Sequence, residues 1–154
     1  MLPVLPAATR VATAQSNLPT LEEIERLQAA MVPIHCEQPE PQHIFHDGWY
    51  ERRLLLPAGM LIVGKVHRHA HPVGVIYGRA LLLSQLARDE VSTGFFSVSA
   101  PGVKRIVLAI EDTLFVTLHR NESNTRDLSL IEAEHIIPEP FEVLGRKPDV
   151  GVLQ

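Results

Sequence analysis

The amino-acid sequence predicts an all-β protein built as a single barrel or sandwich, preceded by an extended arm and a short helix. Short runs rich in Val, Ile and Leu follow one another between Trp49 and His119, most of them separated by Gly, Pro or Glu-Asp turns. Repeated short strands without intervening helices are typical of sandwiches and barrels. The 154 residues, 45% of them hydrophobic, suffice for one domain with a substantial core. Because aromatic residues make up only 5%, aliphatic side chains must fill that core.

The N-terminal part is expected to lie outside the barrel. Residues 1–19 show neither helical nor strand periodicity, which predicts an extended arm that is apolar enough to lie on a partner's surface. Residues 20–47 are predicted to form a helix and a linker. Thr20 and Glu23 have the spacing of a capping box, and Pro33 ends the helix. The apolar residues at helical spacing are Leu21, Ile24, Leu27 and Met31. This single stripe predicts that the helix docks on the barrel or on a neighbouring subunit.

The predicted barrel extends over residues 48–137. Its expected strands are 49–56, 61–66, 73–83, 91–98, 105–110 and 114–119. The segment 127–137 fits either a short helix or an edge strand, and both alternatives remain open. The tail, residues 138–154, contains three prolines and is expected to wrap around the surface.

Composition and charge narrow the range of partners and environments. The net charge is −4 and no basic patch dominates, which argues against nucleic acid as the main partner. No apolar run approaches the roughly 20 residues that span a bilayer, so no membrane partner is expected. The N-terminus does not have the pattern of a signal peptide. The single cysteine, Cys36, fits a reducing cytoplasm, and we do not expect it to be a nucleophile because no third group is positioned to activate it.

Two segments framed by glycines carry the most specific pattern in the sequence. The first extends from Gly59 to Gly78 and contains a cluster of histidines, and the second begins at Gly94 and contains Pro101 and Gly102. Their spacing resembles, without a gap, the two motifs of the cupin superfamily of RmlC-like jelly rolls. The resemblance implies a single double-stranded β-helix (jelly-roll) barrel, in which glycines turn the corners.

The residues at the metal positions of cupins differ from the family pattern. The family uses His, His, Glu and His, and the resemblance places Lys65, His67, His71 and Arg105 at these positions. Two of these side chains can bind a metal, whereas lysine and arginine cannot replace a ligand at neutral pH. The resemblance therefore implies the fold together with a degenerate cupin site, and we expect no cofactor at these four positions.

A different set of histidines could still hold a divalent metal. His67, His69 and His71 alternate, so on a regular strand all three face one side, with neighbours about 6–7 Å apart and the outer two about 13 Å apart. The outer two cannot share a metal unless the strand bends. A pair such as His67 and His69, joined by His119, predicts a three-nitrogen site for Zn, Fe, Mn or Ni. Alternatively, these imidazoles are hydrogen-bonded in the barrel mouth or line a pH-sensitive subunit contact.

The chain also resembles a group of small cupin-like proteins encoded by tailed bacteriophages. The resemblance covers about residues 20–137. It lies in Leu56–Gly59, Ile62–His67, Ser99–Arg105, Glu111–Thr113 and Thr117–His119, and in the helical segments Ile24–Met31 and Leu130–Glu134. It implies a phage setting rather than a reaction: synthesis in the host cytoplasm and a final place in the virion.

These observations favour a non-catalytic accessory protein of a phage particle, either a head decoration (cement) protein or a tail-associated protein. Its terminal arms would bind neighbouring virion proteins, and its barrel is expected to form a dimer or a higher homo-oligomer. The alternative is a metal-dependent enzyme acting on a small molecule, of the sugar epimerase/isomerase or dioxygenase type. A sugar-binding module is disfavoured because only Trp49, Tyr50 and Tyr77 are available to stack on a sugar.

Overall fold

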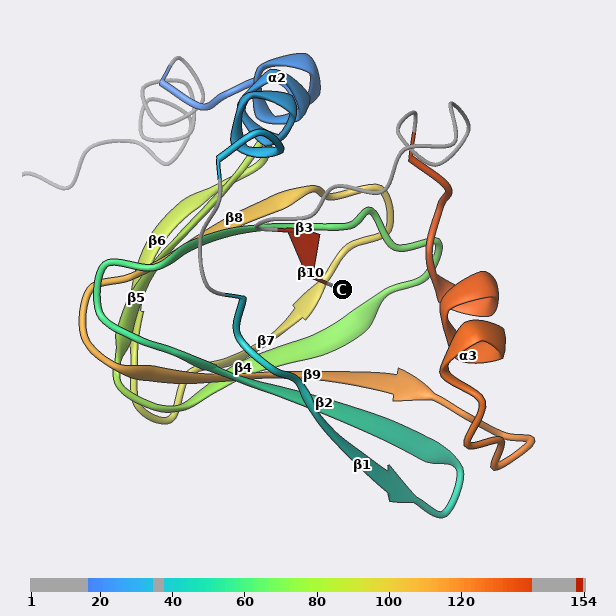
Figure 1. The fold of residues 1–154 in the computed structure, drawn as a ribbon. Helices are drawn as coiled ribbons and strands as arrows, with labels where there is room; N and C mark the ends of the chain where they lie inside the picture. The colour runs from blue at the N-terminus through green and yellow to red at the C-terminus, as the bar shows by residue number, and fades with distance from the viewer. Residues whose placement is uncertain (1–16, 35–37, 140–151, 154) are drawn as a thin grey trace, which may run out of the picture.

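The structure, a computed structural model, describes residues 17–34, 38–139 and 152–153. These residues form two β-sheets that face each other as the walls of a barrel, with one helix on the outside and another at one end (Figure 1). The helices are α2 (Leu21–Met31) and α3 (Leu128–His135). The strands are β1 (Gln42–His46), β2 (Trp49–Leu56), β3 (Leu61–Gly64), β4 (His71–Tyr77), β5 (Arg79–Ser84), β6 (Arg88–Ser92), β7 (Phe96–Ser99), β8 (Arg105–Ala109), β9 (Thr113–Arg120) and β10 (Val152–Leu153).

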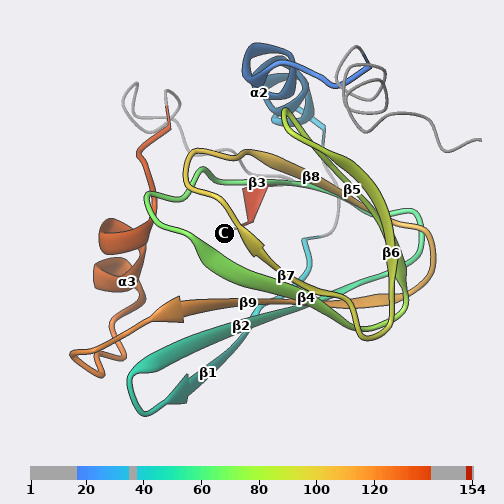
Figure 2. The ribbon, with the colours of Figure 1, turned by 180° about the vertical axis from the view of Figure 1, so that it is seen from behind.

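Each sheet of the described structure has five strands. One has the order β1-β2-β9-β4-β7 and the other β10-β3-β8-β5-β6. Neighbouring strands are antiparallel, except that β10 pairs with β3 in parallel. The facing sides of the two sheets enclose an apolar core that includes Leu54, Ile62, Val75, Val107 and Phe115, as the view from behind in Figure 2 helps to follow. The prediction of an all-β barrel is therefore confirmed.

Two of the predicted strands are divided by glycines. The run predicted over 73–83 is two strands, β4 and β5, which belong to different sheets and separate at Gly78. Gly78 has a φ of +98°, and a Cβ there would lie 2.3 Å from the carbonyl oxygen of Asp112, so this corner requires glycine. The run predicted over 91–98 divides in the same way at Gly94 into β6 and β7. The chain thus crosses between the sheets at these two glycines.

A strand that the sequence analysis did not predict precedes the barrel motifs. β1 pairs with β2 along its whole length, from Gln42 opposite Arg53 to His46 opposite Trp49. Gly48, at a φ of +76°, lies in the tight turn between the two strands. β1 is short and rich in polar residues, so its sequence lacks the alternation that marks the other strands.

Helix α2 begins as the sequence predicts. Thr20 Oγ1 accepts a hydrogen bond from the backbone N–H of Glu23 at 3.1 Å, and the Thr20 N–H donates to the Glu23 carboxylate at 2.8 Å. The predicted apolar stripe is only partly right, because Leu21 and Leu27 are 39% and 37% exposed. Ile24 is the buried anchor and packs on the sheet of β3 and β8, together with the buried amide of Gln28.

The segment 127–137, for which the sequence left a short helix and an edge strand open, contains helix α3. Asp127 caps it by accepting from the Ser129 N–H at 3.0 Å. Backbone hydrogen bonds tie its C-terminal end to the chain that follows β3: the Arg68 N–H donates to the His135 carbonyl, and the Ile137 N–H donates to the Val66 carbonyl. The helix is therefore held beside the open end of the barrel, where the ends of β2 and β9 also lie (Figure 1).

Some sequence predictions concern residues that the structure does not describe. These are most of the arm, Cys36 with its neighbour His35, and the tail apart from residues 138–139 and 152–153. In the part of the chain that is described, neither helix has the length and apolar character needed to cross a membrane.

Candidate functional site

Three of the four predicted metal-binding histidines meet inside the barrel. The ring centroids of His67 and His71 are 3.8 Å apart, and that of His119 lies 5.0 Å from the first and 5.1 Å from the second. The sequence predicted that His67 and His71 could share a site only if the strand bends. The chain does bend, because β3 ends at Gly64 and the chain turns before β4 begins at His71.

His69 does not join this group. Its ring contacts the edge of His135 at a centroid distance of 5.9 Å. The predicted pairing of His67 with His69 is therefore replaced by a pairing of His67 with His71. His135, which the sequence analysis did not single out, lies with its ring centroid 5.2 Å from that of His119, and its Nε2 lies 2.7 Å from the Arg120 carbonyl oxygen. Because the Arg120 group is a carbonyl, His135 Nε2 must be the donor.

Burial keeps the clustered histidines neutral at pH 7. Desolvation is the largest cause for all three and lowers the pKa of His67 to about 3, of His71 to about 4 and of His119 to about 2. Repulsion from the neighbouring imidazoles lowers the pKa values of His67 and His119 further. The nearby Arg105 guanidinium lowers the pKa of His71 further. Among the described residues, His67 Nε2 and His119 Nδ1 have no hydrogen-bond partner. Such unpartnered buried nitrogens are uncommon and mark a place where a ligand can bind.

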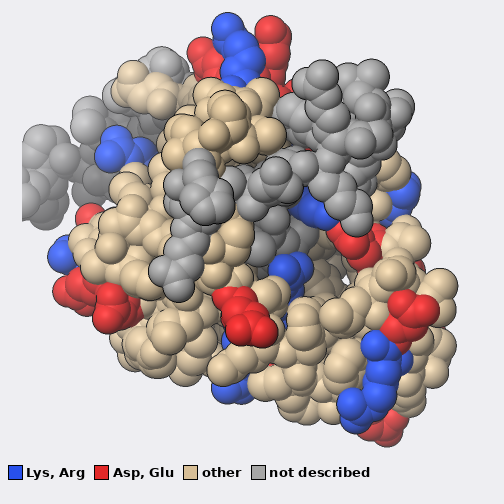
Figure 3. All heavy atoms as spheres, viewed as in Figure 1, with Lys and Arg blue, Asp and Glu red and all other residues tan. Residues whose placement is uncertain are grey.

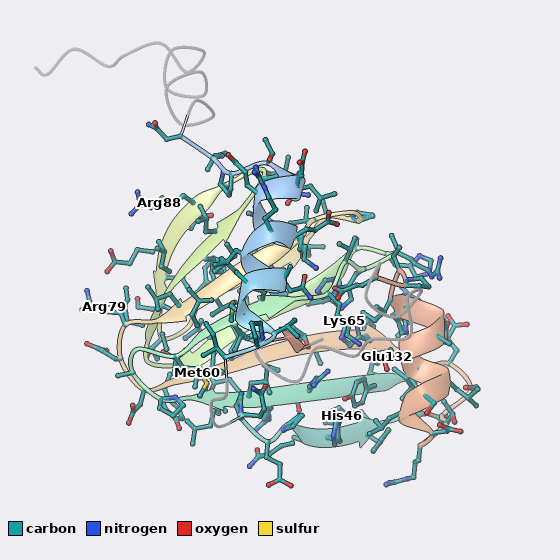
Figure 4. All side chains as sticks on the ribbon, turned by 45° about the horizontal axis from the view of Figure 1, so that its top comes forward. His46, Met60, Lys65, Arg79, Arg88 and Glu132 are labelled. Atoms are coloured by element: carbon teal, nitrogen blue, oxygen red, sulfur yellow. The ribbon has the colours of Figure 1, made fainter. Side chains whose placement is uncertain are left out.

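The two basic residues at the cupin metal positions behave differently. Lys65 forms an ion pair with Glu132 of α3, and Figure 4 shows the two side chains next to each other. Arg105 stays inside, where its guanidinium donates to Ser99 Oγ at 3.1 Å. Burial lowers the pKa of Arg105. The void beside Arg105, His67 and His71 measures only about 20 Å³, so Arg105 takes up the interior space of the barrel.

The four cupin positions do not fit a resident metal ion. One of the two basic side chains turns away from the histidines, and the other places a fixed positive charge beside them. The rings of His67 and His119 are stacked nearly parallel, at an interplanar angle of 4°, rather than directing their nitrogens at one point. In the described residues, no group of three or more His, Cys, Asp or Glu side chains has an arrangement that could hold a metal ion.

A larger cavity lies on the other side of His67 and His119, between the β1–β2 hairpin and α3. Its volume is about 310 Å³. The residues that line it are Pro41, His43, Tyr50, Arg52, Lys65, His67, His119, Leu128, Ile131, Glu132, His135 and Ile136. The sequence analysis missed this site. The alternation along β2 could have indicated it, because Tyr50 and Arg52 share the inward face with Leu54 and Leu56.

Comparison with known proteins finds relatives at the level of structure only. No family model matches the sequence, and no curated protein does. The plu4264 protein from Photorhabdus luminescens superposes with a TM-score of 0.50 at 15% identity, over 64% of this chain and 89% of that one. An RmlC-like cupin family protein with a double-stranded β-helix fold from Methanocaldococcus jannaschii gives a TM-score of 0.47 at 12% identity, over 58% and 85% of the two chains. The likeness to the plu4264 protein shows a shared fold, a barrel of two facing and mainly antiparallel sheets, and nothing further.

The cupin fold is shared by proteins with different roles. Ectoine synthase from P. lautus is also similar, with a TM-score of 0.49 at 16% identity, over 67% of this chain and 76% of that one. At such identities the likeness concerns the fold alone. The function of this chain must therefore be inferred from its own side chains.

Proposed function

We propose that this protein is a non-catalytic accessory protein of a phage particle, built on a degenerate cupin barrel. The observation that carries the proposal is the position of Arg105, whose guanidinium occupies the interior beside His67 and His71 and leaves a void of about 20 Å³. A substrate has no room there, and a divalent ion would be repelled by the fixed charge. The phage setting rests on the sequence resemblance to small cupin-like phage proteins.

In this proposal, the outside of the barrel makes the contacts. The outer face of the β1-β2-β9-β4-β7 sheet exposes large apolar side chains, among them Leu55, Tyr77, Phe96 and Val98. Exposed apolar faces of this kind are typical of interaction surfaces. We propose that this face packs against a second copy of the chain to form a homo-oligomer. The terminal arms, which lie largely outside the described residues, would then bind neighbouring virion proteins, in the head or in the tail.

The composition of purified particles tests this proposal. Particles of the source phage, purified by density gradient and analysed by quantitative mass spectrometry, should contain this chain in a fixed ratio to the major capsid or tail protein. A second gradient in high salt separates bound protein from loosely associated contaminant. Absence of the chain from such particles would contradict the virion role.

A metal-dependent enzyme is the second candidate, and one observation favours it. His67, His71 and His119 are buried, neutral and close together, and two of their nitrogens are unpartnered. Neutral imidazole is a common ligand for Zn and Fe. His67, His71 and His119 would be the residues to hold such an ion, which would supply a Lewis acid for a small molecule.

Elemental analysis decides between the two candidates. The accessory role predicts less than 0.1 equivalent of Zn, Fe, Mn or Ni in protein purified without chelator, and a melting temperature that EDTA does not change. About one equivalent of metal that is lost in His119→Ala and kept in His69→Ala would favour the enzyme. His69 is the matched control because it lies outside the stacked group.

A further inference from the structure

The cavity between the β1–β2 hairpin and α3 has the dimensions of a small-molecule site. Its volume of about 310 Å³ lies at the lower end of the range of ~300–1,000 Å³ found for ligand pockets. One wall is polar and comes from the β1–β2 hairpin, where the Tyr50 hydroxyl and His43 Nδ1 are hydrogen-bonded at 2.6 Å. The opposite wall contains the buried apolar side chains of Ile131 and Ile136. A ligand with one polar end and an apolar body would match both walls.

Arg52 is the charged group in this cavity that has no hydrogen-bonded or ion-paired partner among the described residues, and Glu132 attracts it only from beyond ion-pair distance. Its neighbour Arg53, on the outer face of β2, pairs with Glu51 at 3.2 Å. Arg52 instead faces the cavity, and within the described residues it makes neither a hydrogen bond nor an ion pair, its buried Nε included. Arg52 is half-buried, and a partly desolvated cation without an ion-pair partner is costly, so a ligand that pairs with it gains affinity. The planar guanidinium matches the two oxygens of a carboxylate.

The charges that line the cavity define the ligand further. They belong to Arg52, Lys65 and Glu132, and the last two form an ion pair with each other. His67 and His119 are neutral at pH 7 and contribute hydrogen-bonding nitrogens without charge. One positive charge therefore remains uncompensated among the described residues. This favours a ligand with a single negative charge over a dianion such as a phosphate monoester, which would bring a second charge without a partner.

We propose that this cavity binds a small organic monocarboxylate, with its carboxylate on Arg52 and its carbon skeleton against Ile131 and Ile136. The unpartnered nitrogens of His67 and His119 and the Tyr50–His43 pair are then available to a hydroxyl or carbonyl group on the ligand. The cavity shares His67 and His119 with the histidine cluster, but Arg105 is not among its lining residues, and it lies apart from the outer sheet face that we propose for assembly.

Calorimetric titration of the full chain at pH 7.5 with acetate, hexanoate and benzoate, each alongside its amide, tests the proposal. At least one acid should bind with one-to-one stoichiometry, and its amide should bind at least tenfold more weakly. Arg52→Met should weaken binding of the acid at least tenfold, whereas Arg53→Met, one position away on the opposite face, should change it less than twofold. Failure of all three acids to bind, or equal binding of acid and amide, would overturn the proposal.

A measurement on the unaltered protein covers the case in which Arg52→Met does not fold. Aromatic ¹H–¹³C NMR spectra recorded during the titration should show saturable shifts of Tyr50 and His135, which line the cavity, and none of Tyr77, which is exposed on the outer sheet. Shifts that leave Tyr50 and His135 unchanged would place any bound acid elsewhere and would contradict the proposed site.

Discussion

At the level of single residues, a buried ion pair joins three parts of the chain that are far apart in sequence. Lys104 is only 1% exposed, and its ammonium group donates to Glu139 Oε1 at 2.7 Å. Gln28 of helix α2 donates to the other carboxylate oxygen at 2.8 Å. The network thus connects α2 and the start of β8 to the segment that follows α3. No local pattern could predict it, because charged residues are normally placed on the surface.

Removing the charge of Glu139 should destabilise the protein strongly. Glu139→Gln keeps the shape of the side chain but leaves the Lys104 ammonium buried without a counterion, which costs about 3–5 kcal/mol of unfolding free energy. Urea denaturation measures this loss. Glu134→Gln, on the exposed side of α3, is the matched control and should change stability by less than about 0.5 kcal/mol. The double variant Lys104→Met/Glu139→Leu should recover most of the loss, and a mild effect of Glu139→Gln alone would contradict this account.

The three stacked histidines should make the protein sensitive to acid. Their pKa values in the folded state, about 3, 4 and 2, lie below the value of 6.5 expected in the unfolded chain. Between pH 6.5 and these values, the unfolded chain binds more protons than the folded protein does. The contribution of the three histidines to the unfolding free energy is therefore fully present above pH 6.5 and is lost as the pH falls. Each histidine contributes up to ~1.4 kcal/mol per pH unit, and the three together up to ~4.

Urea denaturation in EDTA at pH 7.5, 6.0 and 5.0 measures this dependence. His71→Gln, which removes one of the three groups, should reduce the slope of unfolding free energy against pH by about a third. A wild-type protein equally stable at pH 7.5 and pH 5.0 would show that these rings are not buried as the structure places them.

At the level of elements, sequence patterns correctly predicted those helix and strand features that depend on residues close together in the sequence. The capping box of α2 and the bounds of β2 follow from residues close in sequence, and both predictions are confirmed. The division of β4 from β5 depends on Gly78 meeting Asp112, which is distant in sequence. For the candidate site, the sequence predicted His67, His71, His119 and Arg105 as residues of interest. It could not predict that the rings of His67 and His71 stack, because this contact depends on the path of the chain after β3.

Helix α2 should depend on its cap, because few of its side chains are buried. Thr20→Ala removes the acceptor for the Glu23 N–H and should cost about 1 kcal/mol of helix stability. Hydrogen–deuterium exchange should become faster in residues 21–31 and stay unchanged in β9, which lies in the interior of its sheet. Arg26→Ala, at an exposed position in the same helix, is the control and should leave the exchange rates of both elements unchanged. Equal acceleration in both would mean that α2 and the barrel open together.

At the level of the whole molecule, polar and apolar surfaces are separated. On the face in Figure 3, acidic and basic side chains lie in small adjoining patches between larger uncharged areas. Ion pairs in the molecule include Arg79 with Glu90 and Arg120 with Glu122. The outer face of the β1-β2-β9-β4-β7 sheet is itself divided, since charged residues lie on β2 and β9, whereas β7 places Phe96 opposite Gly74 and Val98 opposite Pro72. Arg105 fills the inside of the barrel, and we propose the apolar part of this outer face as the area for assembly.

A charge on this face should dissociate the proposed homo-oligomer. A stable dimer buries about 1,200–2,000 Å² in total, and a carboxylate within that area would be desolvated without a partner. We therefore expect wild-type protein at 100 µM to have at least twice the mass of the monomer in sedimentation velocity, and Val98→Glu to shift it to the monomer. Leu130→Glu is the matched control, because Leu130 is exposed to a similar degree, 58% against 66%, but lies in helix α3. If both variants keep the wild-type mass, or if the wild type is already a monomer, copies of the chain do not associate through this face.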